Sequence, residues 1–167
     1  MSKIRKISDF KGITAPLKKD IFIVHGHDNE LVQEVARFIK SLDLEPIILH
    51  EKPSEGRVLF QKFADYASNA SFAVVLLTPD DIGKDKNEDD GKLRHRARQN
   101  VIFELGFFCA KLGHKNVASI CATGIEIPAD YIGVLYIPRG EADWKIKLAK
   151  EMKAGGISFD MNKLLDS

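Results

Sequence analysis

Glu104 is the residue whose setting most clearly suggests chemistry. It is the only charged side chain between Asn100 and Lys111, in the run NVIFELGFFCAK. A buried carboxylate without a partner is costly or has its pKa raised, so it usually has a partner or a task. Asn100, one helical turn earlier, and Phe108, one turn later, would share its face. A buried ion pair with Arg98 or Lys111 is the alternative, and this feature alone favours neither.

A single carboxylate suits one particular class of glycosidic bond. An ordinary O-glycosidic bond normally needs two carboxyl groups, because the leaving oxygen must be protonated. The nicotinamide–ribose bond of NAD⁺ differs, since nicotinamide departs from a cationic ring and leaves as a neutral molecule. A negative charge beside the developing oxocarbenium ion is then the main requirement. One glutamate in a dry pocket could supply it.

The residues His25-Gly26-His27-Asp28 follow the apolar run Ile21–Val24. Gly26 permits a sharp turn or a close approach to a ligand, and backbone N–H groups at a helix start suit a phosphate. Asp28 is better placed to cap the following helix than to contact an anion. His25 and His27 could suggest a metal site. However, no third ligand is close in sequence and alternate residues at a turn diverge, so we expect no metal.

Two further polar groups could contribute to a site. Asp80 and Asp81 follow another apolar run and a proline, where they could contact a ligand or only form a solvated turn. A basic cluster precedes the Glu104 segment and consists of Arg94, His95, Arg96 and Arg98. An arginine there could bind a diphosphate or simply face solvent. Neither a Gly-x-Gly-x-x-Gly nor a Walker A pattern is present, which argues against a Rossmann dehydrogenase or a P-loop NTPase.

Alternating strands and helices must position these residues. Short apolar runs predict strands buried on both faces, at Ile21–Val24, Pro46–Leu49, Phe72–Thr78, Val117–Cys121 and Val134–Ile137. Helical spacing predicts helices after Asp28, around Leu59 to Ala67, over Asn100–Gly113 and from Trp144 to Met152. The third of these is apolar on nearly every side, so we expect it to be buried, with Gly113 as its C-cap.

This alternation predicts an α/β fold with a five-stranded parallel sheet and helices on both faces. The flavodoxin-like strand order 2-1-3-4-5 fits, and ligands bind such sheets where the order reverses, between the first and third strands. The segments His25–Asp28 and Asp80–Asp81 and the helix carrying Glu104 would then meet at one crevice.

Composition limits the remaining possibilities. The chain has 167 residues, which fits one domain, and its net charge of +1 gives no electrostatic footprint for nucleic acid or an anionic membrane. No apolar run approaches the roughly 20 residues of a membrane helix, and no signal peptide is evident, so we expect a cytoplasmic protein.

Cys109 and Cys121 should be buried, reduced thiols. We expect a polar leader over 1–20, the domain over 21–153 and a tail over 154–167. The charged stretch Gly83–Arg96 should be a mobile, solvated loop.

Several sequence blocks together resemble the TIR-like domains of bacterial antiphage effectors, including those fused to STING-like cyclic-dinucleotide sensors. The blocks are IFIVHGHD, AVVLLTPDD, RARQNVIFELGFF and IPADYIGVLYI, and the resemblance spans about Ile21 to Met152. It implies a TIR fold and cleavage of NAD⁺, as substrate rather than cofactor, to nicotinamide and ADP-ribose or a cyclic form. It maps the catalytic glutamate onto Glu104 and the nucleotide site onto His25, Gly26, His27 and Asp28, with Asp80 and Asp81 beside it. Arg98 and Asn100 complete our candidate substrate-binding set.

The resemblance also implies how the activity would be controlled. Such effectors are switched on by self-association into dimers or filaments, which completes the NAD⁺ site across protomers. They usually carry a cyclic-nucleotide sensor, for which we see no room here, so an excised domain or a separate partner is expected. The stretch Gly83–Arg96 is a candidate for ordering on assembly.

Three other functions compete. One is a non-enzymatic TIR adaptor, which would not need a lone carboxylate in an apolar helix. Another is a nucleoside deoxyribosyltransferase-like enzyme with a glutamate nucleophile. The third is a receiver-like phosphoacceptor. It is the least supported, because His25-Gly26-His27 replaces the acidic pair that a receiver needs after its first strand.

Overall fold

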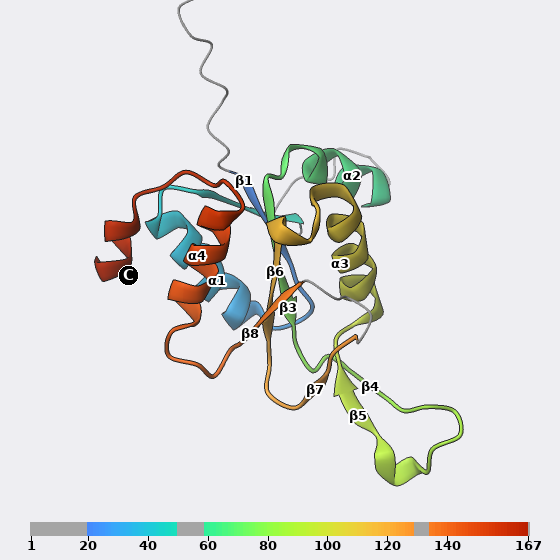
Figure 1. Ribbon diagram of the computed structural model, residues 1–167. Helices are drawn as coiled ribbons and strands as arrows, with labels where there is room; N and C mark the ends of the chain where they lie inside the picture. Colours follow the sequence, from blue (N-terminus) through green and yellow to red (C-terminus); the bar gives the residue numbers. More distant parts are fainter. Residues whose placement is uncertain (1–19, 50–58, 129–133, 167) are drawn as a thin grey trace, which may run out of the picture.

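Short apolar runs form the centre of the fold, because each can be buried on both faces of a parallel sheet. The structure is a computed structural model that describes residues 20–49, 59–128 and 134–166. Its main sheet has five parallel strands in the order β2-β1-β3-β6-β8 (Figure 1). The strands are β1 (Asp20–Val24), β2 (Glu45–Ile48), β3 (Phe72–Leu77), β6 (Val117–Cys121) and β8 (Leu135–Pro138). The predicted flavodoxin-like order 2-1-3-4-5 is confirmed.

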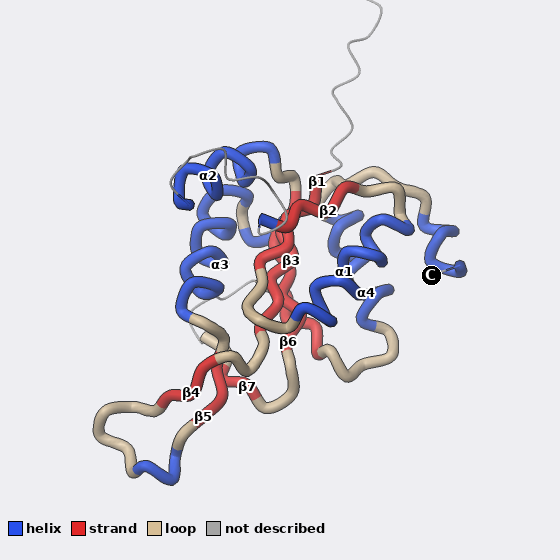
Figure 2. Tube along the Cα trace, turned by 180° about the vertical axis from the view of Figure 1, so that it is seen from behind, coloured by secondary structure: helices blue, strands red, loops and turns tan. Residues whose placement is uncertain are grey.

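Helices cover both faces of this sheet, as Figures 1 and 2 show. The helices α1 (Asn29–Ser41) and α4 (Trp144–Ala154) pack on one face, and α2 (Leu59–Asn69) and α3 (Gln99–Leu112) pack on the other. Each face has its own hydrophobic cluster, since alternate side chains of a strand point to opposite faces. The Asp28 carboxylate accepts a hydrogen bond from the Leu31 backbone N–H at 2.9 Å, so its predicted role as the α1 cap is confirmed.

Helix α3 is less buried than its sequence predicts. Its buried residues are Val101, Leu105, Phe108 and Cys109, which recur at helical spacing along one face. Phe103, on another side, is 57% exposed. The expectation of an all-round buried helix is therefore wrong, because within the described structure only one face of α3 packs on the sheet. The C-cap prediction is confirmed: Gly113 has a φ of 78° and its N–H donates to the Cys109 carbonyl.

The charged stretch after β3 forms a projecting β-hairpin, which we call the arm (residues 81–96). Its strands β4 (Asp81–Gly83) and β5 (Arg94–Arg96) pair antiparallel, and β5 also pairs with β7 (Ile125–Glu126). A short 3₁₀ turn, η3 (Asp90–Lys92), lies between β4 and β5. Both views show the arm extending away from the body (Figures 1 and 2). The predicted loop is thus wrong at its two ends, which pair as β4 and β5, whereas most of the residues between them are exposed, as expected of a solvated segment.

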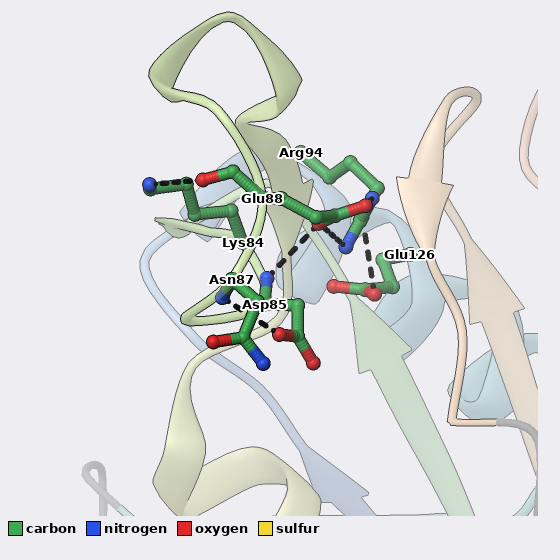
Figure 3. A network of polar contacts seen from close by, with 6 residues as sticks. All are labelled: Lys84, Asp85, Asn87, Glu88, Arg94 and Glu126. Atoms are coloured by element: carbon green, nitrogen blue, oxygen red, sulfur yellow. Dashed lines mark hydrogen bonds and ion pairs between the residues drawn. The ribbon is translucent and has the colours of Figure 1, made fainter.

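Opposite charges within the arm bind one another (Figure 3). The Glu88 carboxylate accepts two hydrogen bonds from the Arg94 guanidinium, at 3.0 and 2.7 Å, and the Asp85 N–H donates to it at 3.0 Å. Arg94 also donates to the Glu126 carboxylate at 3.2 Å. The hydrogen bond from Arg94 is the main reason why the pKa of Glu88 is lowered. The mixed charges of this stretch therefore form ion pairs, of Arg94 with Glu88 inside the arm and with Glu126 in β7.

Replacing Glu88 with alanine should loosen the arm without unfolding the body. The variant loses the bidentate partner of Arg94 and the acceptor for the Asp85 N–H. We expect several-fold faster trypsin cleavage at the arm lysines Lys84, Lys86 and Lys92, because local opening exposes them. The control is Asp89→Ala, since the side chain of Asp89 makes no capping hydrogen bond. Equal cleavage of both variants would show that the network does not order the arm.

Some expectations fall wholly or partly outside the described residues. They are the leader up to residue 19 and the middle of the IPADYIGVLYI block. The described part of the predicted tail contains a 3₁₀ helix, η5 (Met161–Asp166). Cys109 and Cys121 are buried and free of disulfides, as predicted. Among the described residues, every helix is too short or too polar to cross a membrane.

Candidate functional site

The loops that follow β1 and β3 meet at the carboxyl edge of the sheet. These strands are neighbours in register, so their ends lie side by side. The His27 backbone N–H donates to Oδ1 of Asp80 at 3.1 Å. The other carboxylate oxygen of Asp80 accepts from the buried Thr78 hydroxyl at 2.7 Å. The predicted convergence of these two loops at the switch point, where the strand order reverses between β1 and β3, is confirmed.

Gly26 is required by this convergence. A Cβ atom at position 26 would lie 1.8 Å from Oδ2 of Asp80 and 2.6 Å from its Cγ. The sequence suggested a tight turn or a close approach to a ligand at Gly26, and the structure shows a close approach to Asp80. His25, beside it, places its Nδ1 2.8 Å from the Gly26 carbonyl oxygen.

Arg98, directly before α3, contacts the loop that follows β1. Its Nη1 lies 3.0 Å from Nε2 of His27, across 71 positions of sequence. The Arg98 side chain is exposed and makes no other polar contact within the described residues, so its remaining guanidinium N–H groups could bind an anion. The predicted basic cluster is therefore divided, since Arg94 is held within the arm and Arg96 packs its guanidinium over Gly83.

An ion pair that sequence reasoning missed closes the other side of the first loop. Arg139, which follows β8, donates to Oδ2 of Asp28 at 2.7 Å. Its backbone N–H donates to the Cys121 carbonyl at the end of β6. Asp28 therefore both caps α1 and binds a residue 111 positions away. Arg139 belongs to no recognisable motif, and only the strand order places β8 near this edge.

The two remaining candidates lie at the margins of this cluster. Asp81 is in β4, paired in register with Arg96 at the base of the arm. Asn100 is in the first turn of α3, where it is exposed and has no recorded polar partner within the described residues. Neither contacts the His27–Asp80–Arg98 group through a recorded hydrogen bond.

Glu104 lies on the flank of α3 that faces β1 and α2. It is one turn before Phe108, whose ring packs 4.8 Å from that of Phe22 in β1 and 5.8 Å from that of Phe63 in α2. Because Arg98 at the start of α3 contacts His27 and Phe108 packs on Phe22, Glu104 lies along α3 between these two contacts with the first strand and its loop.

The carboxylate of Glu104 is half-buried and has no ion-pair or hydrogen-bond partner among the described residues. Burial raises its pKa from 4.5 to about 7. Neither basic residue considered from sequence binds it, since Arg98 contacts His27 and the Lys111 ammonium lies 6.0 Å from the ring centre of Phe107. The buried-ion-pair alternative therefore has no support in the described part of the chain.

Removing this charge should stabilise the fold at high pH. Between pH 4.5 and about pH 7, folded Glu104 holds a proton that the unfolded chain has lost, so its contribution to stability falls as pH rises. We expect Glu104→Gln to raise the free energy of unfolding by about 2–3 kcal/mol at pH 8, with the gain vanishing below pH 4.5.

Urea unfolding at both pH values measures this difference. The control is Glu45→Gln, an exposed glutamate at the opposite end of the strands. If Glu104→Gln lowered stability at pH 8, the carboxylate would have a favourable partner and would not be a strained, desolvated group.

A groove of about 260 Å³ lies beside α3 but does not include Glu104; it is lined by Arg96, Ala97, Ile102, Glu126, Ile127 and Pro128. In the described ranges, no group of three His, Cys, Asp or Glu side chains is arranged to hold a metal ion. The arrangement can therefore offer an anion-binding arginine, two hydrogen-bonded loops and one desolvated carboxylate.

Comparison with known proteins gives a consistent set of relatives. Residues 20–141 match the family model described as CAP12/Pycsar effector protein, TIR domain. The chain is 46% identical over 153 residues to Uncharacterized protein YuaY of Escherichia coli (strain K12), covering 91% of this chain and 50% of that protein. It is 33% identical over 126 residues to Protein tirC of Dictyostelium discoideum, covering 70% and 62%.

A shorter match reaches CD-NTase-associated protein 12 of Flavobacterium daejeonense. The identity is 34% over 70 residues, covering 41% of this chain and 21% of that protein. The chain thus spans at most about three-fifths of the length of these curated relatives.

Proposed function

Because the chain belongs to the family of CAP12/Pycsar effector TIR domains, we propose that it cleaves NAD⁺ between nicotinamide and ribose, with Glu104 as the catalytic carboxylate. The observation that carries the proposal is the setting of Glu104. It is a desolvated carboxylate with a pKa raised to about 7, with no basic partner among the described residues, on a helix that begins at the switch point. Such perturbed groups concentrate at functional sites.

The chemistry requires little more than this charge. The bond between ribose C1′ and the nicotinamide nitrogen breaks, and its electron pair stays on that nitrogen, which neutralises the pyridinium ring. The ribose becomes an oxocarbenium ion, which an ionised Glu104 stabilises across a water-poor site. Water then adds to C1′ and loses a proton, giving ADP-ribose, or a nucleophile within the molecule adds to give a cyclic form. No metal or further cofactor is needed, because NAD⁺ itself is the substrate.

The surrounding residues suit the other parts of NAD⁺. An exposed Arg98 can bind the diphosphate through its free N–H groups, since guanidinium binds phosphate in bidentate fashion. The His25–Asp28 loop is hydrogen-bonded to Asp80, and its backbone groups could contact the nucleotide. Asn100, one turn before Glu104, could bind a ribose hydroxyl or the nicotinamide amide.

Direct measurement of nicotinamide release from NAD⁺ tests the proposal. The products should be nicotinamide together with ADP-ribose or its cyclic isomer, separated by chromatography. A parallel incubation with deoxynucleosides and free bases tests for base exchange instead. Base exchange without NAD⁺ cleavage would favour a deoxyribosyltransferase-like enzyme, and inactivity in both reactions at every protein concentration would favour a non-enzymatic TIR adaptor.

Self-association belongs to the same proposal. We expect the NAD⁺ site to be completed when protomers assemble into dimers or filaments. The protein would then act inside the cell as an effector of antiphage defence, downstream of a cyclic-nucleotide signal. Specific activity should then rise steeply with protein concentration or crowding, by about tenfold or more over a range in which light scattering detects assembly. Specific activity that stays constant across that range would exclude a shared site.

A further inference from the structure

The contact between Arg98 and His27 fixes the proton on the His27 ring. Arg98 can only donate hydrogen bonds, because a guanidinium has no acceptor. Its Nη1 lies 3.0 Å from Nε2 of His27, so Nε2 must be the unprotonated, accepting nitrogen. The single proton of the neutral ring is then on Nδ1, which lies 3.5 Å from Oδ1 of Asp80. This contact therefore requires a neutral His27.

We propose that neutral His27 is a positioning residue that holds Arg98 toward the NAD⁺ diphosphate, and that protonation of His27 releases Arg98. The inference rests on the proposed function. A protonated imidazole carries N–H groups on both nitrogens, so Nε2 can no longer accept from Arg98. Two cations would then face each other at hydrogen-bond distance. Arg98 would lose its hydrogen bond to His27, and with it the orientation of its guanidinium toward the diphosphate.

Asp80 makes the ring respond in this way. Its carboxylate is held by the Thr78 hydroxyl and the His27 backbone N–H, and its side chain is only 7% exposed. A protonated His27 is attracted to this fixed anion and repelled by Arg98. The neutral ring therefore contacts both Asp80 and Arg98, whereas the protonated ring keeps only Asp80 as a favourable partner.

The other charged groups near His27 are already bound. Asp28, the next residue, caps α1 and binds Arg139 from the end of β8. His25 contacts the Gly26 carbonyl. Among the described residues with a recorded side-chain contact to His27, only Asp80 and Arg98 carry charge. The His27 side chain is 67% exposed, so solvent can exchange the proton freely.

The consequence is a pH dependence of binding that differs from that of bond cleavage. Ionisation of Glu104 governs the chemical step, whereas His27 governs the affinity for the diphosphate. Imidazoles change charge between about pH 5 and pH 8, and affinity falls with the fraction of competent protein. Acidification should therefore raise the KM for NAD⁺ through His27 and lower kcat through Glu104.

Calorimetric titration of NAD⁺ into Glu104→Gln isolates the binding step, because this variant neither titrates at position 104 nor consumes the ligand. We expect binding to weaken about tenfold from pH 8 to pH 5.5. Adding His27→Gln should flatten this dependence, since a glutamine amide oxygen can accept from Arg98 at both pH values. Adding Arg98→Ala should weaken binding at pH 8 and also flatten the dependence. Adding His114→Gln, an exposed histidine in η4 (His114–Asn116) at the opposite edge of the sheet, should leave it unchanged.

A tenfold dependence that persists in the His27→Gln protein, or no dependence before that change, would overturn the proposal. A second measurement needs no substrate: ¹⁵N NMR of the unliganded protein at pH 8 should show His27 protonated on Nδ1. Protonation on Nε2 instead would overturn the inferred contact with Arg98. Failure of the proposed function is distinct, because the wild-type protein would then release no nicotinamide at any pH, whatever the state of His27.

Discussion

Replacing Glu104 with glutamine should reduce nicotinamide release from NAD⁺ by about a thousandfold or more, while the fold is retained. Glutamine has nearly the shape of glutamate but no charge, so it cannot stabilise the oxocarbenium ion. Because the charge is desolvated, as its pKa of about 7 indicates, its electrostatic effect on a nearby cation is larger than in water. Release of nicotinamide under saturating NAD⁺ gives kcat directly.

The same variant separates function from stability. Glu104→Gln should be more stable than the wild type at pH 8 and yet inactive, a combination typical of a charge kept for function at a cost in stability. Glu45→Gln, at the opposite end of the strands, should change neither property. Substantial activity in Glu104→Gln would remove this glutamate from the mechanism and with it the assignment of the activity.

Replacing Gly26 with alanine should lower the affinity for NAD⁺ by about tenfold or more, the second large effect. The new Cβ would lie 1.8 Å from Oδ2 of Asp80, so that carboxylate must move. Asp80 is a short, largely buried side chain, and movement breaks its bonds to His27 and to the buried Thr78 hydroxyl. A buried hydroxyl left without its acceptor also costs about 1–3 kcal/mol of stability. NAD⁺ titration and thermal unfolding measure the two effects.

Gly83→Ala is the matched control. Its Cβ would lie 2.2 Å from the Arg96 guanidinium carbon, an overlap nearly as severe as that between a Cβ at position 26 and Asp80. However, the guanidinium is the far end of a flexible side chain in the arm, which can move aside. We expect the affinity for NAD⁺ to stay within about twofold of wild type. Equal losses in both glycine variants would show that the contact with Asp80 has no special role.

The architecture could be predicted from sequence because it depends on local patterns. Each strand of the main sheet was visible as a short apolar run, and the alternation of strands and helices restricts the order of a parallel sheet to few possibilities. Asp28 as a cap and Gly113 as a C-cap were also predictable, since each acts within one turn of its helix. The unusual setting of Glu104 was visible because it lies in an uninterrupted apolar run.

Other features were decided only by tertiary structure. The base of the arm pairs with β7, about 30 positions further along the chain, and this pairing could not be read from the local composition, which suggested a loop. Helix α3 is apolar all round in sequence, but which side is buried depends on where the sheet lies. The bonds of Asp80 to His27 and of Arg139 to Asp28 join residues 53 and 111 positions apart.

The physical reason for this division is the range of the interactions. Turn chemistry, capping and hydrophobic periodicity act over a few residues, so the amino-acid order alone determines them for this chain. The partner of a polar side chain at a strand end is set by which strands are neighbours. The chemical groups of the site were therefore present in the sequence, whereas their pairing into His27–Asp80, His27–Arg98 and Asp28–Arg139 depended on the order of the strands.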